Sequence, residues 1–166
     1  MSEVRIQRED FDPGEEIAAL SAGNGKTGAI ATFTGLVRGD DALTAIRIRI
    51  VADMGGYQQL ITAGIPILGA FLYGGVYQLP QAYDFSCTGL YTNLTPTDAY
   101  RGAGRPEATY AIERAMDMLA DQMGIDPMDL RTRNFIRKEQ FPYTAFTGLT
   151  YDSGDHHAAA AKAAEL

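Results

Sequence analysis

The sequence is poor in cysteine, histidine and positive charge, and each shortage excludes a class of protein. Its 166 residues include a single cysteine, Cys87, so no disulfide can form within the chain, as is typical of the reducing cytoplasm. The two histidines, His156 and His157, are adjacent, and the chain has no third histidine. Neighbours on a helix point apart, so a solvated tail is favoured over a metal site.

The charge balance and the longest uncharged stretch exclude two further classes. The net charge is −7, and so acidic a chain has no general attraction for nucleic acid or an anionic membrane. Residues 54–83 carry no charge, but glutamines, prolines and glycines interrupt them. They fit a buried segment of a larger enzyme better than a membrane span. The first twelve residues lack the apolar core of a signal peptide, so we expect a cytoplasmic protein.

The first 41 residues predict a strand, a helix and a second strand. Apolar and polar residues alternate around Val4, as in a half-buried strand. Asp12 and Pro13 start a helix that continues to about Ser21, and residues 28–37 (GAIATFTGLV) predict a buried strand. The turn between them, residues 22–28, contains Gly-Lys-Thr, as a phosphate-binding loop does. The glycine required five positions earlier is missing, so a solvated turn is preferred.

From residue 42 onward, strands and helices are mixed. Residues 44–52 predict the clearest strand, because isoleucines alternate with arginines. Residues 57–63 fit either a short helix or an irregular segment, and residues 68–73 fit either a helix or a strand. Residues 83–93 predict another strand, and residues 95–105 a loop. Cys87 lies in that strand and fits a small buried hydrophobe better than a nucleophile.

Helices dominate the last third of the chain. Apolar residues recur at three-to-four spacing after Pro106, and Gly124 ends that helix. Glu107, Glu113 and Asp117 fit its solvated face better than a catalytic pair. Asp126 and Pro127 open a shorter helix to about residue 135, and residues 156–166 predict an alanine-rich helix with frayed ends. The pattern predicts an α+β fold, with a mixed sheet flanked by helices.

The loop before the long helix is the candidate site. In residues 99–105 (AYRGAGR), Gly102 and Gly104 allow the backbone to approach a ligand closely. Arg101 and Arg105 add fixed positive charge, and the start of a helix has free N–H groups and a positive end. These features predict either a cradle for an oxyanion or an ordinary helix start with surface arginines. The segment lacks the third glycine of a dinucleotide fingerprint.

Four stretches carry a family resemblance. They are residues 92–136 (TNLTPTDAYRGAGRPEATYAIERAMDMLADQMGIDPMDLRTRNFI), residues 139–155 (EQFPYTAFTGLTYDSGD), and the upstream segments ADMGGYQQL and GAFLYGGVYQLP. Residues 43–155 thereby resemble the large subunit of molybdenum hydroxylases of the xanthine dehydrogenase, aldehyde oxidase and carbon monoxide dehydrogenase type. The resemblance implies a fragment of a molybdopterin-binding domain.

The resemblance also implies a cofactor, partners and a site. The cofactor would be molybdopterin with molybdenum, usually as the cytosine dinucleotide, and water would supply oxygen to an aldehyde, a heterocycle or carbon monoxide. Partner chains with iron–sulfur clusters and FAD would take the electrons. The residues over the molybdenum would be Tyr100, Arg101, Gly102, Ala103, Gly104 and Arg105. Carbon monoxide dehydrogenases carry a copper-bridging cysteine where Gly102 stands, so the likeness is to their cysteine-free relatives.

The resemblance predicts an incomplete site. The family's catalytic glutamate and its upstream glycine-rich cofactor loop have no counterpart in this chain. We therefore expect a fragment of an oxidoreductase without activity of its own, and assign no catalytic or metal-ligating residue.

The N-terminal unit resembles a different protein of the same cofactor. Residues 4–41, above all GAIATFTGLVR, resemble the start of the catalytic large subunit of molybdopterin synthase. Gly35 and Arg38 match positions near that enzyme's substrate pocket, but its catalytic lysines have no counterpart. The predicted division is residues 1–41, residues 42–155 and an alanine-rich tail, residues 156–166. Alternative predictions are a truncated synthase subunit acting in cofactor biosynthesis, and a non-functional hybrid.

Overall fold

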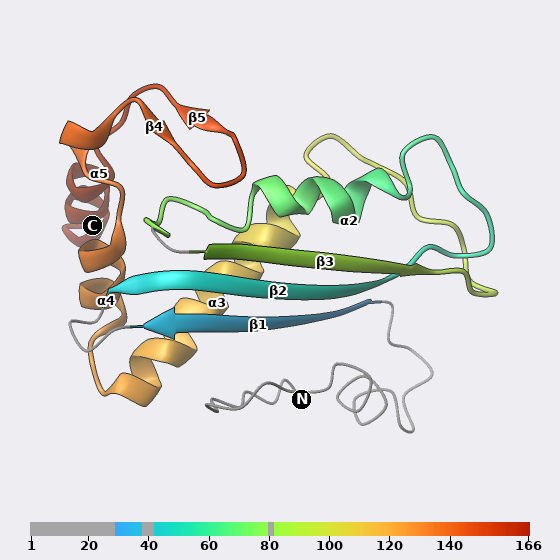
Figure 1. Cartoon of the computed structure of the whole chain (residues 1–166), viewed down its shortest axis with the longest axis horizontal. Helices are drawn as coiled ribbons and strands as arrows, with labels where there is room; N and C mark the ends of the chain where they lie inside the picture. The colour runs from blue at the N-terminus through green and yellow to red at the C-terminus, as the bar shows by residue number, and fades with distance from the viewer. Residues whose placement is uncertain (1–28, 38–41, 80–81) are drawn as a thin grey trace.

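A computed structural model describes residues 29–37, 42–79 and 82–166 (Figure 1). The predicted strand near Val4, the helix from Pro13 and the Gly-Lys-Thr turn lie outside these residues. The elements in chain order are β1 (Ala29–Val37), β2 (Leu43–Asp53), α2 (Gly64–Leu68), η1 (Gly69–Phe71), β3 (Ala82–Leu90), α3 (Arg105–Met123), α4 (Pro127–Asn134), η2 (Lys138–Gln140), β4 (Tyr143–Thr144), β5 (Thr150–Tyr151) and α5 (His156–Ala164).

The main sheet is mixed, as predicted. Its strand order is β1-β2-β3, with β1 antiparallel and β3 parallel to the central β2. A parallel pair needs a crossover connection, and here the crossover runs through α2 and η1 (Figure 1). β1 belongs to the first predicted unit and β2 to the second, so one sheet contains strands from both. The division at residue 41 remains a prediction.

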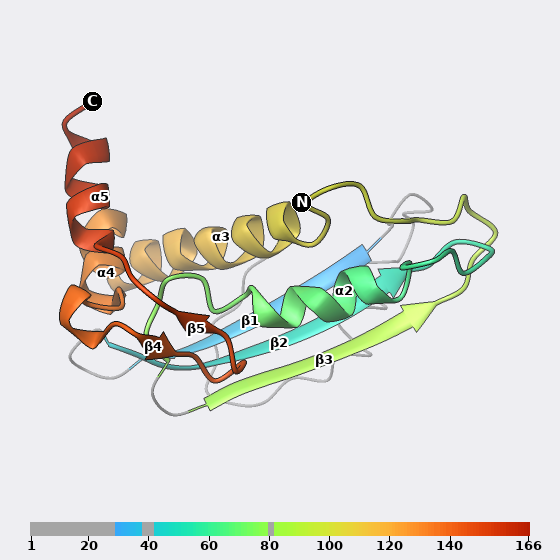
Figure 2. The same ribbon diagram turned by 90° about the horizontal axis from the view of Figure 1, so that it is seen from above.

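One face of the sheet carries the core. Ile46, Ile48 and Ile50 of β2 are buried on this face, which confirms the predicted alternation. Figure 2 shows α2 and α3 lying along the same side of the sheet. α3 contributes buried residues at a spacing of four, which place one stripe of the helix in the core: Ala108, Ile112, Met116 and Ala120.

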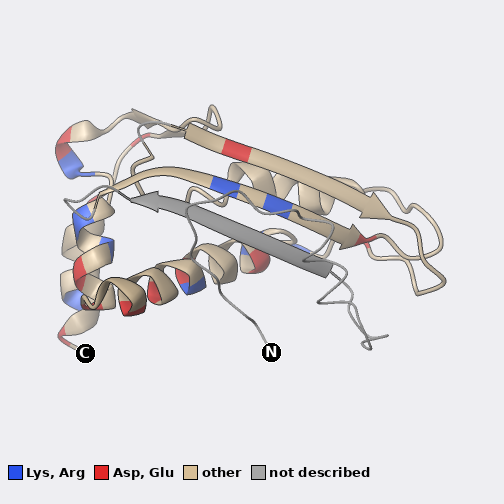
Figure 3. Ribbon diagram, turned by 60° about the horizontal axis from the view of Figure 1, so that its bottom comes forward, with Lys and Arg blue, Asp and Glu red and all other residues tan. Residues whose placement is uncertain are grey.

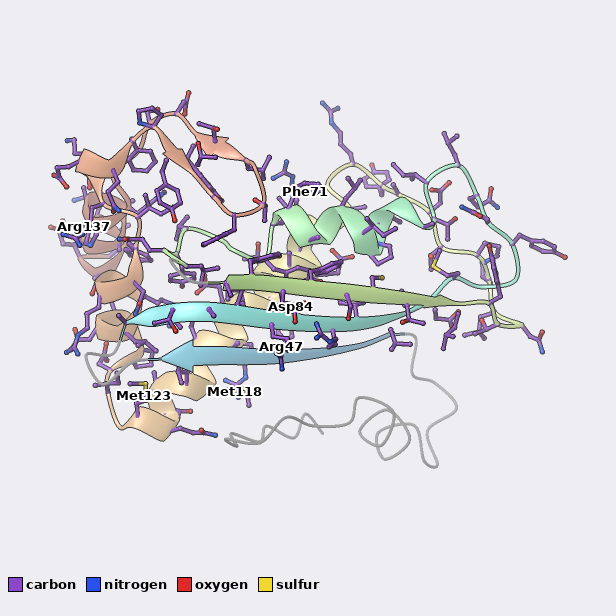
Figure 4. The ribbon with its side chains drawn as sticks, in the orientation of Figure 1. Arg47, Phe71, Asp84, Met118, Met123 and Arg137 are labelled. Atoms are coloured by element: carbon purple, nitrogen blue, oxygen red, sulfur yellow. The ribbon has the colours of Figure 1, made fainter. Side chains whose placement is uncertain are left out.

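On the opposite face of the sheet, β2 and β3 carry a cluster of ion-paired side chains. Arg47 and Arg49 of β2 both contact Asp84 of β3, with nitrogen–oxygen distances of 3.1 and 2.9 Å. Figure 3 shows basic positions on β2 beside an acidic position on β3, and Figure 4 labels Arg47 and Asp84 there. Hydrogen bonds from the arginines, that of Arg49 first, lower the pKa of Asp84. These ion pairs are partly exposed, so they contribute little to stability.

The ends of the two main helices follow their sequence signals. Gly124 ends α3 with a left-handed φ of 68°, a conformation that favours glycine. Asp126 begins α4: its carboxylate accepts the N–H groups of Met128 at 2.8 Å and Asp129 at 3.1 Å. This is the capping interaction that satisfies otherwise unpaired amides at a helix start. Both helix predictions are confirmed.

The structure settles the segments that the sequence left open. Residues 57–63 are irregular, and residues 64–71 are helical in α2 and η1. The strand predicted for residues 83–93 ends earlier, at Leu90. After Leu90 the chain stays beside the segment that follows β2. The N–H of Met54 donates to the carbonyl of Leu90, and the N–H of Thr92 donates to the carbonyl of Gly55.

The C-terminal helix is docked, so the prediction of a solvated tail is wrong for its first residue. Asp155 caps α5 by accepting the N–H of Ala158 at 2.9 Å. The half-buried ring of His156 packs edge-on against Phe135 and Phe141, with ring centroids 6.2 and 5.5 Å apart. Phe135 and Phe141 are distant from His156 in the sequence, and a contact between distant residues produces no periodic pattern. The docking of α5 therefore could not be predicted from the sequence.

Candidate functional site

The candidate loop, residues 99–105, ends in a tight turn that leads into α3. The N–H of Ala103 donates to the carbonyl of Tyr100 at 2.8 Å, and the N–H of Arg105 donates to that of Gly102 at 3.1 Å. Gly102 and Gly104 have φ values of +106° and +87°. Residues with side chains rarely adopt such angles, so the sequence places glycine where this turn requires it.

The structure places the predicted site residues together on this one turn. Tyr100 is 90% exposed, and Arg101, Gly102 and Arg105 are also exposed. A side-chain carbon added at Gly102 would meet no atom within 4 Å. The loop therefore exposes two guanidinium groups, a phenol and an open stretch of backbone.

Gly104 seats this turn on α2. It is buried, and a side-chain carbon added there would lie 3.4 Å from the carbonyl oxygen of Ile65 and 3.8 Å from the amide nitrogen of Gly69. The two backbones thus approach closely, and a larger residue would push them apart. Of the six predicted residues, Gly104 is thus buried and Ala103 is half-buried, whereas Tyr100, Arg101, Gly102 and Arg105 are exposed.

The start of α3 offers fewer free amides than the sequence suggested. Pro106 has no N–H, and the N–H of Arg105 is used within the turn. Glu107 places an acid in the first turn, where it interacts favourably with the helix dipole. The positive character of the loop therefore comes from Arg101 and Arg105.

A second polar cluster lies along the middle of α3, where α4 packs against it. Arg131 of α4 binds Glu113 at 2.7 Å and Asp117 at 2.8 Å. The hydroxyl of Tyr77 donates to both carboxylate oxygens of Glu113, at 2.9 Å each. Burial and the neighbouring Glu113 raise the pKa of Tyr77 above its usual range. Glu113 and Asp117 therefore join α3 to α4, which corrects the prediction of a solvated face.

The remaining candidates carry no site. Cys87 is half-buried in β3, and burial raises the pKa of its thiol, so the predicted unreactive role fits. The described residues include no group of three or more histidine, cysteine, aspartate or glutamate side chains placed to hold a metal ion. In the same part of the chain, no helix is both long and apolar enough to cross a membrane.

Comparison with known proteins decides the family. The molybdopterin cofactor-binding domain family matches residues 19–135. The chain belongs to this family. It is similar to the carbon monoxide dehydrogenase large chain of Hydrogenophaga pseudoflava, with 42% identity over 126 residues, covering 74% of this chain and 16% of the relative.

Solved structures show the same fold. Reconstituted CO dehydrogenase from Oligotropha carboxidovorans matches with a TM-score of 0.71 and 36% identity, covering 82% of this chain and 17% of that one. Quinoline 2-oxidoreductase from Pseudomonas putida 86 matches with a TM-score of 0.71 and 27% identity, covering 82% of this chain and 18% of that one. The chain thus spans about a sixth of the length of the curated relative, and it is part of a molybdenum hydroxylase large-subunit fold.

Proposed function

We propose that the 99–105 loop contacts molybdopterin, in its cytosine dinucleotide form, as part of the large subunit of a molybdenum hydroxylase. The observation that carries this proposal is the geometry of the turn. Arg101 and Arg105 bracket Gly102, whose surroundings are open, and all three are exposed. A cofactor rich in phosphate and oxo groups needs donors and close backbone approach, and this loop supplies both.

Each exposed residue has a separate part in holding the cofactor. The guanidinium groups of Arg101 and Arg105 donate in a fixed fork that matches phosphate or oxo oxygens. Gly102 lets a ligand reach the backbone, and the Tyr100 hydroxyl adds a neutral donor. These donors suit the cofactor's oxygen atoms and not the metal itself, which takes lone pairs. When bound, the cofactor supplies the oxidative hydroxylation of a small substrate, with oxygen from water.

The substrate we propose is an aldehyde, a heterocycle or a similar small molecule. Gly102 has no sulfur to offer copper, unlike the cysteine that the carbon monoxide dehydrogenases carry at this position. One structural relative is a quinoline oxidoreductase, a heterocycle enzyme by its name. We further propose cytoplasmic iron–sulfur and FAD subunits as electron-accepting partners, by analogy with the family.

The test is cofactor content. The chain is co-expressed with such partner subunits in a bacterial host that makes the dinucleotide, and molybdenum and released pterin are measured per purified chain. We expect a pterin content well above that of mock purifications, and a large loss in the double variant Arg101→Gln, Arg105→Gln. The matched control is Arg114→Gln, an arginine farther along α3. Pterin at background in the unaltered chain would contradict the proposal.

A further inference from the structure

The 99–105 loop is supported from a segment that sequence reasoning left without a role. Residues 92–104 are tied to residues 53–69 along their length. The two backbones touch first at Gly55: a side-chain carbon added there would lie 2.5 Å from Pro96 and from the carbonyl oxygen of Thr95. They touch last at Gly104, against α2. Between these points stands one buried polar side chain, that of Thr62.

Thr62 joins the two segments through its hydroxyl. The hydroxyl donates to the carbonyl of Thr97 at 2.6 Å and accepts the N–H of Gln59 at 2.8 Å. The hydroxyl thus acts both as an acceptor, within its own segment, and as a donor, to Thr97 two positions before the loop. A buried hydroxyl is costly to leave without a hydrogen-bond partner. Moving the Thr97 carbonyl would break its bond with Thr62, so this bond restrains the backbone at Thr97.

The burial of Thr62 sets it apart from other polar side chains. It is 0% exposed, and the other buried polar or charged residues described are Thr44 and Asn134. Asn134 accepts the N–H of Leu43 and donates to the carbonyl of Leu130, so it belongs to the α4 side of the molecule. Thr62 is the buried polar group that contacts the approach to the candidate loop.

Asp98 adds a second tie beside it. One carboxylate oxygen accepts the N–H of Ile61 at 3.2 Å and the N–H of Ala99 at 2.8 Å. The same oxygen therefore connects the Thr62 segment to the first residue of the loop. Asp98 is exposed, so its bonds are weaker restraints than those of the buried threonine.

We propose that Thr62, assisted by Asp98, is a positioning residue for the 99–105 loop. It touches no ligand. It fixes the backbone at residues 97–99, so that Tyr100 and Arg101 emerge at one place and in one direction. The restraint itself stands on the hydrogen bonds alone, whereas its consequence for the cofactor rests on the proposed function.

The test compares Thr62→Val, which keeps the buried volume and removes the hydroxyl, with Thr62→Ser, which keeps the hydroxyl. The matched control is Thr132→Val, because the Thr132 hydroxyl donates within its own helix, to the carbonyl of Asp129. We expect Thr62→Val to speed amide hydrogen exchange at residues 97–104 by about tenfold or more. Exchange in α3 beyond Met116 should stay unchanged, and Thr62→Ser should restore slow exchange.

A second readout is the pterin content of the co-expressed protein, which should fall in Thr62→Val and recover in Thr62→Ser. Asp98→Ala, at an exposed position, should give a smaller change of the same kind and serves if Thr62→Val does not fold. Unaltered exchange at residues 97–104 would overturn the inference. Faster exchange with undiminished pterin would overturn the positioning role. Pterin absent from the unaltered chain, with exchange responding as expected, would refute the proposed function and leave the restraint standing.

Discussion

The α3–α4 corner and the loop that precedes α3 are built in opposite ways. At the corner, Leu130 is fully buried and Arg131 is held by two carboxylates. At the loop, Tyr100 is 90% exposed and Leu60, on the supporting segment, is 97% exposed. The corner is thus fixed by burial and ion pairs, whereas the loop side leaves large side chains open to solvent.

Different parts of α3 therefore have different roles. α3 buries one stripe of side chains, from Ala108 near its start to Ala120 near its end, so the core holds both halves of the helix. The middle of α3 carries the polar network of Glu113 and Asp117, and its N-terminal end carries the candidate loop. The α3–α4 corner fixes α3 through buried and ion-paired side chains, whereas glycines set the backbone of the loop and its exposed side chains supply donors.

The largest effect should come from breaking the corner with Leu130→Ala. The side chain is fully buried, and such truncations cost about 3–4 kcal/mol because they remove apolar contacts and leave a cavity. The paired variant Leu60→Ala, on the loop side, should change stability by less than about 0.5 kcal/mol. Urea unfolding followed by circular dichroism measures both. Equal costs for the two leucines would refute the comparison.

Two arginines give the next contrast. Arg131→Met leaves Glu113, Asp117 and Tyr77 without their cationic partner, and we expect a loss of about 2–3 kcal/mol. Arg101→Met, at the exposed loop, should leave unfolding unchanged within about 0.5 kcal/mol while lowering pterin content. The same unfolding experiment, with a pterin assay beside it, separates the two roles. A destabilised Arg101→Met would show that the loop is part of the scaffold.

Gly55 and Gly148 test whether close backbone contact restrains the segment that supports the loop. Gly55 and Gly148 both have positive φ, +70° and +83°, but only at Gly55 would a side-chain carbon collide with other atoms. Gly55→Ala should therefore cost about 1–2 kcal/mol, and Gly148→Ala about 1 kcal/mol or less, from conformational strain alone. Hydrogen exchange at residues 92–98 should rise in the first variant only. An equal response in both would mean that the close contact at Pro96 is not a restraint.

The smallest effect concerns pH and the docking of α5. Burial, followed by the nearby His157, lowers the pKa of His156 below its usual 6.5. The unfolded chain then takes up this proton first, so the stabilising contribution is present above pH 6.5 and is lost as pH falls through the lowered value. His156→Phe should flatten unfolding stability between pH 7 and the onset of carboxylate titration. An unchanged pH profile in that variant would assign the effect to other groups.

Local patterns predicted the frame of the molecule. Alternating isoleucines predicted β2, and spaced apolar residues with a terminal glycine predicted α3. The loop was found because its glycines and arginines are contiguous in sequence. Thr62 was missed, since its partner Thr97 lies 35 residues away, and Arg131 was missed because Glu113 lies 18 residues away. Contacts between distant segments leave no periodic signal in a single sequence.

In the proposed function the cofactor binds at the 99–105 loop, whereas the α3–α4 corner supports α3 and does not contact the cofactor. The most direct measurement is amide hydrogen exchange of the co-expressed protein from a host that makes molybdopterin, compared with the same protein from a host that cannot. We expect that protection gained with the cofactor includes residues 99–105, with no change in α4 at Leu130. Protection that leaves residues 99–105 untouched, in protein shown to contain pterin, would contradict it.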